Sequence, residues 1–173
     1  IYHVRAAYLQ DWGGPDVPLL WRFQKKNAGS GAHGDLNAHI IDMARFITGE
    51  EITEVTGAIE ETFIKERIIP GSDTAGGGIV GKSASKGARK GKSTVDDAVL
   101  FLARFSGGAV ASFEATRLST GDQNRNRIEI NGEHASIAWD LHDLHRLQYF
   151  DHKDEGKLRG WRSIHVTDHG GEH

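Results

Sequence analysis

An aspartate and a histidine four residues apart, Asp35 and His39, are the side chains in this sequence that best combine type and spacing for chemistry. They lie in the segment 34–49, where apolar residues recur at helical spacing: Leu36, Ile40, Met43, Ala44 and Ile47. Residues four apart on a helix have Cβ atoms roughly 6 Å apart, so the carboxylate and the imidazole would lie side by side. An imidazole titrates near neutral pH, and a neighbouring carboxylate supports its protonated form. The pair therefore fits acid–base chemistry on a bound substrate.

The same residues also have a purely structural interpretation. Asp35 stands where a helix N-cap belongs, and an N-cap aspartate accepts hydrogen bonds from the first backbone N–H groups. His39 could pack against the protein and bond to Asp42, three residues further along. Gly49 is placed to end the helix in a left-handed conformation. Spacing alone favours this structural interpretation over a catalytic one.

Length and composition indicate one globular domain. The chain has 173 residues, of which 38% are hydrophobic and 26% charged, and this is enough to bury a core. A formal net charge of −3 gives no reason to expect nucleic-acid or membrane binding. The absence of cysteine excludes disulfides and thiolate metal sites. No signal peptide is visible, so we expect a cytoplasmic protein, and the start at Ile1 rather than methionine suggests a fragment.

The remaining periodicity is that of β-strands. Alternating or strongly apolar runs predict strands over 1–12, 51–63, 95–105, 109–116, 127–130, 135–139 and 162–166. Short turns such as Asn131-Gly132 favour hairpins. We therefore expect an α+β fold, a mostly antiparallel open β-sheet with the helix packed on one face. Aromatic side chains on the uncovered face would favour self-association, so we expect a dimer or tetramer through the open sheet face.

The segment 70–94 is dense in glycine, serine and lysine and predicts a flexible loop. Residues 76–83 match the phosphate-binding pattern G-x-x-x-x-G-K-S, but that pattern needs a strand before it and a helix after it. The flanking residues favour neither a strand nor a helix, so we expect no phosphate site. It stays open whether this segment closes over an anionic cofactor that is held elsewhere. We also expect no metal site, because three or four ligands fixed by packing are not apparent among the later histidines, His142, His145, His165, His169 and His173.

Residues 34–46 resemble the catalytic helix of the glucose–fructose oxidoreductase/inositol dehydrogenase (Gfo/Idh/MocA) family. In that family an aspartate and a histidine four residues apart open a helix of the C-terminal domain. The resemblance covers the chain from Ile1 to about Asp140 and includes further matches in family order, at Trp21-Arg22, 28–31, 96–108, 115–117 and 126–132. The chain is thus similar to the C-terminal half of a two-domain dehydrogenase.

The resemblance implies an oxidoreductase that moves a hydride between NAD or NADP and a sugar, inositol or related polyol. His39 would accept the hydroxyl proton, and Asp35 would orient the substrate and balance the charge on His39. Arg22 would bind substrate oxygens through its fork of donors. Asn37, where the family often has glycine, would narrow the pocket or add an amide contact.

Family members also carry an N-terminal dinucleotide-binding domain with a glycine loop and a catalytic lysine, and neither feature is recognisable in this sequence. Residues 1–173 would then be the substrate-binding and dimerisation domain, inactive alone, with the cofactor bound mainly elsewhere. Two other interpretations stay open. The chain could be a non-catalytic sugar-binding or dimerisation scaffold of the same fold, or a nucleotide-binding protein that uses Gly76 to Ser83.

Overall fold

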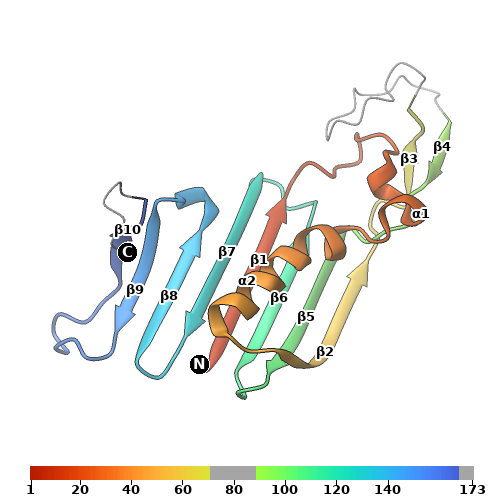
Figure 1. Ribbon diagram of the computed structural model, residues 1–173. Coiled ribbons are helices and arrows are strands. Elements are labelled where there is room, and N and C mark those ends of the chain that lie inside the picture. The colour runs from red at the N-terminus through yellow and green to blue at the C-terminus, as the bar shows by residue number, and fades with distance from the viewer. Residues whose placement is uncertain (71–88, 168–173) are drawn as a thin grey trace.

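A long open sheet forms the body of the molecule, and one helix crosses one of its faces (Figure 1). The computed structural model describes residues 1–70 and 89–167. The helical elements are η1 (Trp21–Phe23), α1 (Lys25–Ala28), η2 (His33–Asn37), α2 (Ala38–Thr48) and η4 (Leu141–Asp143). The strands are β1 (His3–Gln10), β2 (Ile52–Glu61), β3 (Glu66–Ile68), β4 (Lys90–Lys92), β5 (Ala98–Phe105), β6 (Val110–Thr116), β7 (Asn124–Asn131), β8 (Ala135–Asp140), β9 (Arg146–Asp151) and β10 (Arg162–His165).

The main sheet has eight strands in the order β10-β9-β8-β7-β1-β6-β5-β2. All neighbours are antiparallel except β1 and β6, which are parallel. The expected α+β fold with a mostly antiparallel sheet is confirmed, and the parallel pair of β1 and β6 makes the sheet mixed. A parallel pair needs a long connection, and here that connection includes η2, α2, β2 and β5. The helix is thereby placed over the sheet within one crossover.

The core lies between α2 and the centre of the sheet. Ile40 and Ala44 of α2 are fully buried against alternating residues of the central strands. Phe101 of β5 and Phe113 of β6 are cross-strand partners whose rings stack 4.9 Å apart. The residues that alternate with them along the same strands point to the opposite face. The sheet therefore has one covered face and one open face along β1, β5, β6 and β7.

The side chains of β2 switch from one face of the sheet to the other part-way along the strand. Gly57 has φ +60°, and the pairing register with β5 shifts between Thr56 and Ile59. Val55 pairs with a core-facing residue of β5 and lies on the helix side, whereas Ile59 pairs with Leu100 and lies on the open side. A bulge of this kind turns the side chains that follow it to the other face. The edge strand therefore exposes apolar side chains on both faces.

A small lobe of η1, α1 and the two-stranded β3–β4 sheet stands at one end of the main sheet (Figure 1). β4 corrects part of the predicted loop over 70–94, because Lys90–Lys92 pairs with β3. Its sequence, Lys-Gly-Lys, has no apolar alternation, so only the pairing with β3 reveals it. The glycine-rich pattern at 76–83 lies outside the described residues.

Arg67 of β3 holds this lobe to the rest of the chain. Its guanidinium is buried and donates to the carbonyl oxygens of Gly13 and Gly14, at 2.7 Å each, and to that of Val17. It also lies 3.4 Å from the buried Asp97 carboxylate and stacks 3.6 Å from the Phe23 ring. Burial lowers the pKa of Arg67, and the Asp97 carboxylate opposes that shift. One cation therefore joins two loops, a strand and the aromatic ring of η1.

Replacing Arg67 should lower the free energy of unfolding much more than replacing an exposed arginine in a similar ion pair. Arg67→Met would leave the buried Asp97 carboxylate without its cation. We therefore expect the free energy of unfolding to fall by about 3–5 kcal/mol. The matched control is Arg104→Met, since Arg104 pairs with Glu54 while both are more than half exposed; we expect a loss below about 1 kcal/mol. Urea unfolding curves measure both changes. Equal losses would contradict the assigned role of Arg67.

Candidate active site

The helix that carries Asp35 and His39 begins at a carboxylate from a distant part of the chain. Asp96 is buried just before β5, and its Oδ1 accepts a hydrogen bond from the Gly31 N–H at 2.7 Å. Its Oδ2 accepts one from the His33 N–H at 2.6 Å. The structural interpretation of Asp35 as N-cap is wrong, because the helical turn already begins at His33 and Asp35 lies inside it. The first backbone N–H groups donate instead to Asp96 and to the Ser30 hydroxyl. The Asp35 carboxylate is left for other contacts.

The approach to this carboxylate requires glycine at position 31. A Cβ atom on Gly31 would lie 1.9 Å from the Asp96 carbonyl oxygen, which no side chain can tolerate. The chain then enters a wide π-helical turn, η2, before the regular helix α2. Such turns are uncommon and occur frequently at functional sites. Gly49, at φ +68°, ends α2 as the sequence predicts.

Asp35 lies in η2 and is held by two arginines. Its Oδ2 accepts a hydrogen bond of 2.7 Å from Nη2 of Arg117, the residue that follows β6. Nη1 of Arg22 is 3.8 Å from the same oxygen. Arg117 is buried, and it also donates to the Gly31 carbonyl oxygen and lies over the Trp12 ring. Within the described residues Oδ1 of Asp35 has no hydrogen bond, so the carboxylate is fixed by one oxygen and can accept with the other.

His39 is exposed on the outer side of α2. Its ring meets the ring of Tyr8 edge-on, with the centroids 5.8 Å apart. The suggested bond from His39 to Asp42 is not formed; Asp42 instead lies 3.7 Å from Arg45. The imidazole is therefore not committed to a structural partner on its own helix.

A cavity of about 320 Å³ opens beside Asp35, and His39 is not among the residues that line it. This volume is near the lower end of the range for small-molecule sites, and aromatic, amide and charged side chains converge on it. The predicted residues Arg22 and Asp35 both line it, and Tyr8 connects it to His39. Its lining is Tyr8, Gln10, Trp12, Arg22, Asp35, Gln123 and Asn124.

Asn37 does not reach this cavity. It is the last residue of η2 and is 0% exposed, and its Nδ2 is 3.3 Å from His33 Nδ1. Its amide therefore faces the interior, and the predicted substrate contact is corrected to a role in packing the wide turn. Helical spacing already pointed this way, since Asn37 lies three and seven positions before the buried Ile40 and Ala44.

Several lining residues were absent from the sequence-based prediction. Arg117 was not predicted as a site residue either; it does not line the cavity but fixes Asp35, and nothing in the sequence linked the two. Gln10 and Trp12 lie at the end of the first strand, and Asn124 begins β7. In residues 1–70 and 89–167, no three or more acidic or histidine side chains are grouped to hold a metal ion.

Comparison with known proteins identifies the family. Residues 1–138 match the model of the GFO/IDH/MocA C-terminal domain. The chain belongs to the Gfo/Idh/MocA family. The resemblance predicted from residues 34–46 and the matches that follow them is therefore confirmed. The family model ends within β8, so β9 and β10 lie beyond it.

Similar proteins of this family include sugar dehydrogenases. Levoglucosan dehydrogenase of Pseudarthrobacter phenanthrenivorans is 40% identical over 167 residues, which are 96% of this chain and 42% of that protein. An oxidoreductase domain protein from Kribbella flavida is 46% identical, with a TM-score of 0.86 over 96% of this chain and 41% of its own. A levoglucosan dehydrogenase in complex with NADH and levoglucosan is 39% identical, with a TM-score of 0.81 over 96% of this chain and 40% of its own. The chain spans about two fifths of the length of these relatives.

Removing the remote cap should loosen the start of the helix. We expect Asp96→Asn to lower the free energy of unfolding by about 1–3 kcal/mol, because one of the two buried N–H groups would face an amide N–H₂ group. Amide hydrogen exchange at Gly31 and His33, whose N–H groups donate to Asp96, should accelerate accordingly. The control is Asp42→Asn, an exposed carboxylate on the same helix, with an expected change within about 0.5 kcal/mol. Unchanged exchange in Asp96→Asn would contradict the assignment of the cap.

Proposed function

We propose that this chain is the substrate domain of a nicotinamide-dependent dehydrogenase that oxidises a hydroxyl group of a sugar, inositol or related polyol. The observation that carries the proposal is one cavity that joins Arg22 and Asp35 and borders Tyr8, which contacts the exposed His39. Guanidinium, carboxylate and amide groups match the hydroxyls of a polyol. The levoglucosan dehydrogenases among the relatives support the class of substrate.

In this mechanism the substrate carbon loses a hydride and its hydroxyl loses a proton, leaving a carbonyl. The His39 imidazole accepts the proton, and Asp35 balances the charge that forms on it. Arg117 keeps Asp35 in place through the bond to Oδ2, so that Oδ1 remains free to accept from the substrate. Arg22 binds a substrate oxygen as a donor. The bound cofactor would supply the hydride acceptor.

NAD or NADP would be held mainly by a dinucleotide-binding domain, as the resemblance implies. The outer side of α2 suits the approach of such a domain. His39, Asp42 and Phe46 recur there at helical spacing, and Phe46 is 86% exposed. Exposed aromatic surface next to a catalytic base favours coverage by another apolar surface. The described residues contain no helix long and apolar enough to span a membrane, and the cytoplasmic location expected from the sequence stays a prediction.

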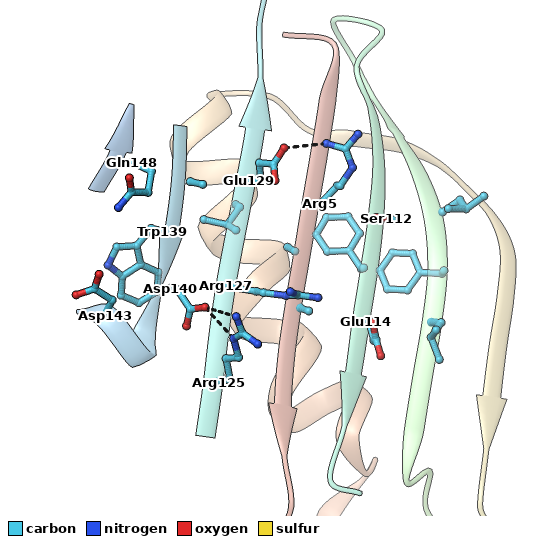
Figure 2. A pocket seen from close by; sticks show the side chains of 18 of the residues that line it. Arg5, Ser112, Glu114, Arg125, Arg127, Glu129, Trp139, Asp140, Asp143 and Gln148 are labelled. Atoms are coloured by element: carbon cyan, nitrogen blue, oxygen red, sulfur yellow. Dashed lines mark hydrogen bonds and ion pairs between the residues drawn. The ribbon is translucent and has the colours of Figure 1, made fainter. Parts of the chain in front are cut away.

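We also propose that the open sheet face pairs with a second copy of the chain. This face is hollowed, with a cavity of about 500 Å³ over the central strands. Figure 2 shows charged side chains from β1, β7 and β8 along it, including the ion pairs Arg5–Glu129 and Arg125–Asp140. Beside them Leu100 and Leu102 of β5 are exposed. An apolar strip flanked by paired charges is typical of a surface that self-associates.

Loss of the base should abolish oxidation without unfolding the protein. In the complete gene product that contains this chain, we expect His39→Ala to lower kcat with levoglucosan about 10²- to 10⁴-fold. The control Glu133→Gln changes an exposed carboxylate in the turn between β7 and β8, and it should retain wild-type kcat. NADH or NADPH absorbance measures the rate, and thermal unfolding checks the fold. Full activity of His39→Ala would disprove the assignment, whereas sugar binding without any turnover in the wild type would favour the non-catalytic scaffold.

A charge on the open sheet face should weaken self-association. We expect Leu102→Lys to raise the dissociation constant at least about tenfold, because the lysine would be buried without a partner. The control is Val55→Lys, which alters an equally exposed residue on the helix side of the neighbouring strand. Sedimentation equilibrium measures both variants. If the two variants associate equally well, the interface lies elsewhere.

A further inference from the structure

One wall of the cavity beside Asp35 is a chain of directed hydrogen bonds. Trp12 Nε1 donates to Gln10 Oε1 at 2.6 Å, and Gln10 Nε2 donates to Asn124 Oδ1 at 2.8 Å. Gln10 ends β1 and Asn124 begins β7, and the two are paired in register on adjacent strands. The three side chains all line the cavity. They form one unit, which we name the amide relay.

The direction of the amide relay follows from the chemistry of its first member. An indole nitrogen can only donate a hydrogen bond, so Gln10 must present its carbonyl oxygen to Trp12. The amide nitrogen of Gln10 then faces Asn124, which must accept with Oδ1. The remaining polar atom, Asn124 Nδ2, has two hydrogens and no hydrogen-bond partner in the described part of the chain. The relay therefore presents a donor, and not an acceptor, at this end of the cavity.

The backbone next to Asn124 has an uncommon conformation. Gln123 has φ +45°, a left-handed conformation that is unfavourable for a residue with a side chain. Among the described residues it is the one non-glycine residue with positive φ. Gln123 also lines the cavity. Strain of this kind persists where the surrounding structure imposes it, and here it accompanies the entry of β7 and the placement of Asn124.

The polar groups that line the cavity thus differ in whether they donate or accept hydrogen bonds. Asp35 accepts only, whereas the Arg22 guanidinium and Asn124 Nδ2 donate only. A hydroxyl placed at the donor end needs an acceptor for its own hydrogen, and each relay oxygen has one lone pair left because the other already accepts a hydrogen bond. An ether oxygen has no hydrogen and accepts freely. The donor end therefore suits an acceptor-only oxygen.

We propose that the amide relay is a specificity-determining unit that binds the ring or bridge oxygen of a cyclic sugar through Asn124 Nδ2. The proposal rests on the function proposed above and narrows its substrate class. Cyclic and anhydro sugars carry such an oxygen, whereas inositols carry hydroxyls alone. The complete protein should therefore use levoglucosan at least about 10-fold more efficiently than myo-inositol, judged by kcat/KM.

Reversing the relay with a nearly isosteric change tests the proposal. In Gln10→Glu the introduced carboxylate still accepts from Trp12, but Asn124 must turn its Nδ2 toward that carboxylate and its Oδ1 toward the cavity. We expect the levoglucosan/myo-inositol ratio of kcat/KM to fall about 10- to 100-fold, mainly through the KM for levoglucosan. Asn124→Asp places an oxygen at the same point and should have the same effect. Gln10 acts here as a positioning residue, and a purely structural role would alter both substrates equally.

Two further variants separate the effect of the amide orientation from the effect of the added negative charge. Asn27→Asp adds the same negative charge on the exposed surface of α1, outside the cavity, and should leave the ratio unchanged. Trp12→Phe removes the indole donor without adding charge, so Gln10 is free to turn, and the ratio should fall by a smaller factor. A ratio that stays within about threefold of wild type in both Gln10→Glu and Asn124→Asp would overturn the proposal.

Wild-type preference for myo-inositol would overturn the proposal as well, even if the variants fail to fold. Failure of the broader function has a different signature, namely no cofactor reduction with either compound by the wild type. In that case calorimetric titration of the wild type and Gln10→Glu with levoglucosan and with myo-inositol tests the proposal. The quantity compared is the ratio of the two dissociation constants in each protein. An unchanged binding ratio would reject the proposal.

Discussion

Two adjacent buried carboxylates, Asp96 and Asp97, hold the parts of this domain together. Asp96 binds the backbone N–H groups at the start of the helix that carries Asp35 and His39. Asp97 faces the other way, accepting from the Ile64 N–H and pairing with the buried Arg67 that anchors the end lobe. The backbone carbonyl of Asp97 also accepts from the N–H of Arg117, the residue that fixes Asp35. The chemistry of the site therefore depends on a dipeptide that does not itself line the cavity.

This arrangement places Asp35 and Arg22 on helical turns and Gln10 and Asn124 at the ends of two paired strands. Buried charges are costly to desolvate and stabilise a fold poorly, but removing one partner is more costly still, so they favour a single arrangement. Arg117 is such a residue: it joins Asp35, the Gly31 carbonyl and the Trp12 ring at one point. The carboxylate proposed to receive the substrate and the indole that directs the amide relay thus share one neighbour. A shift of η2 would change both ends of the cavity together.

Local patterns predicted much of the fold, and long-range contacts account for what they missed. Alternation identified β1, β5 and β6, and the apolar stripe with Gly49 identified α2, because these signals lie within a few residues. The parallel pairing of β1 with β6, the strand at Lys90–Lys92 and the cap by Asp96 all depend on residues far apart in the chain. Asn37 is a different case, since its own spacing from Ile40 and Ala44 marked the buried side of the helix. The resemblance predicted a substrate contact for Asn37 from its position in the family motif, whereas its helical spacing indicates a buried side chain.

The central strand β1 serves both faces of the sheet. Val4, Ala6 and Tyr8 face the helix side, and Gln10 continues that side to the cavity next to η2. Arg5 alternates with them and lies on the open face, in contact with Glu129 (Figure 2). Since side chains alternate along a strand, substitutions on one face leave the other face intact. The proposed self-association and the proposed chemistry can therefore be altered separately, although both are built on the same strand.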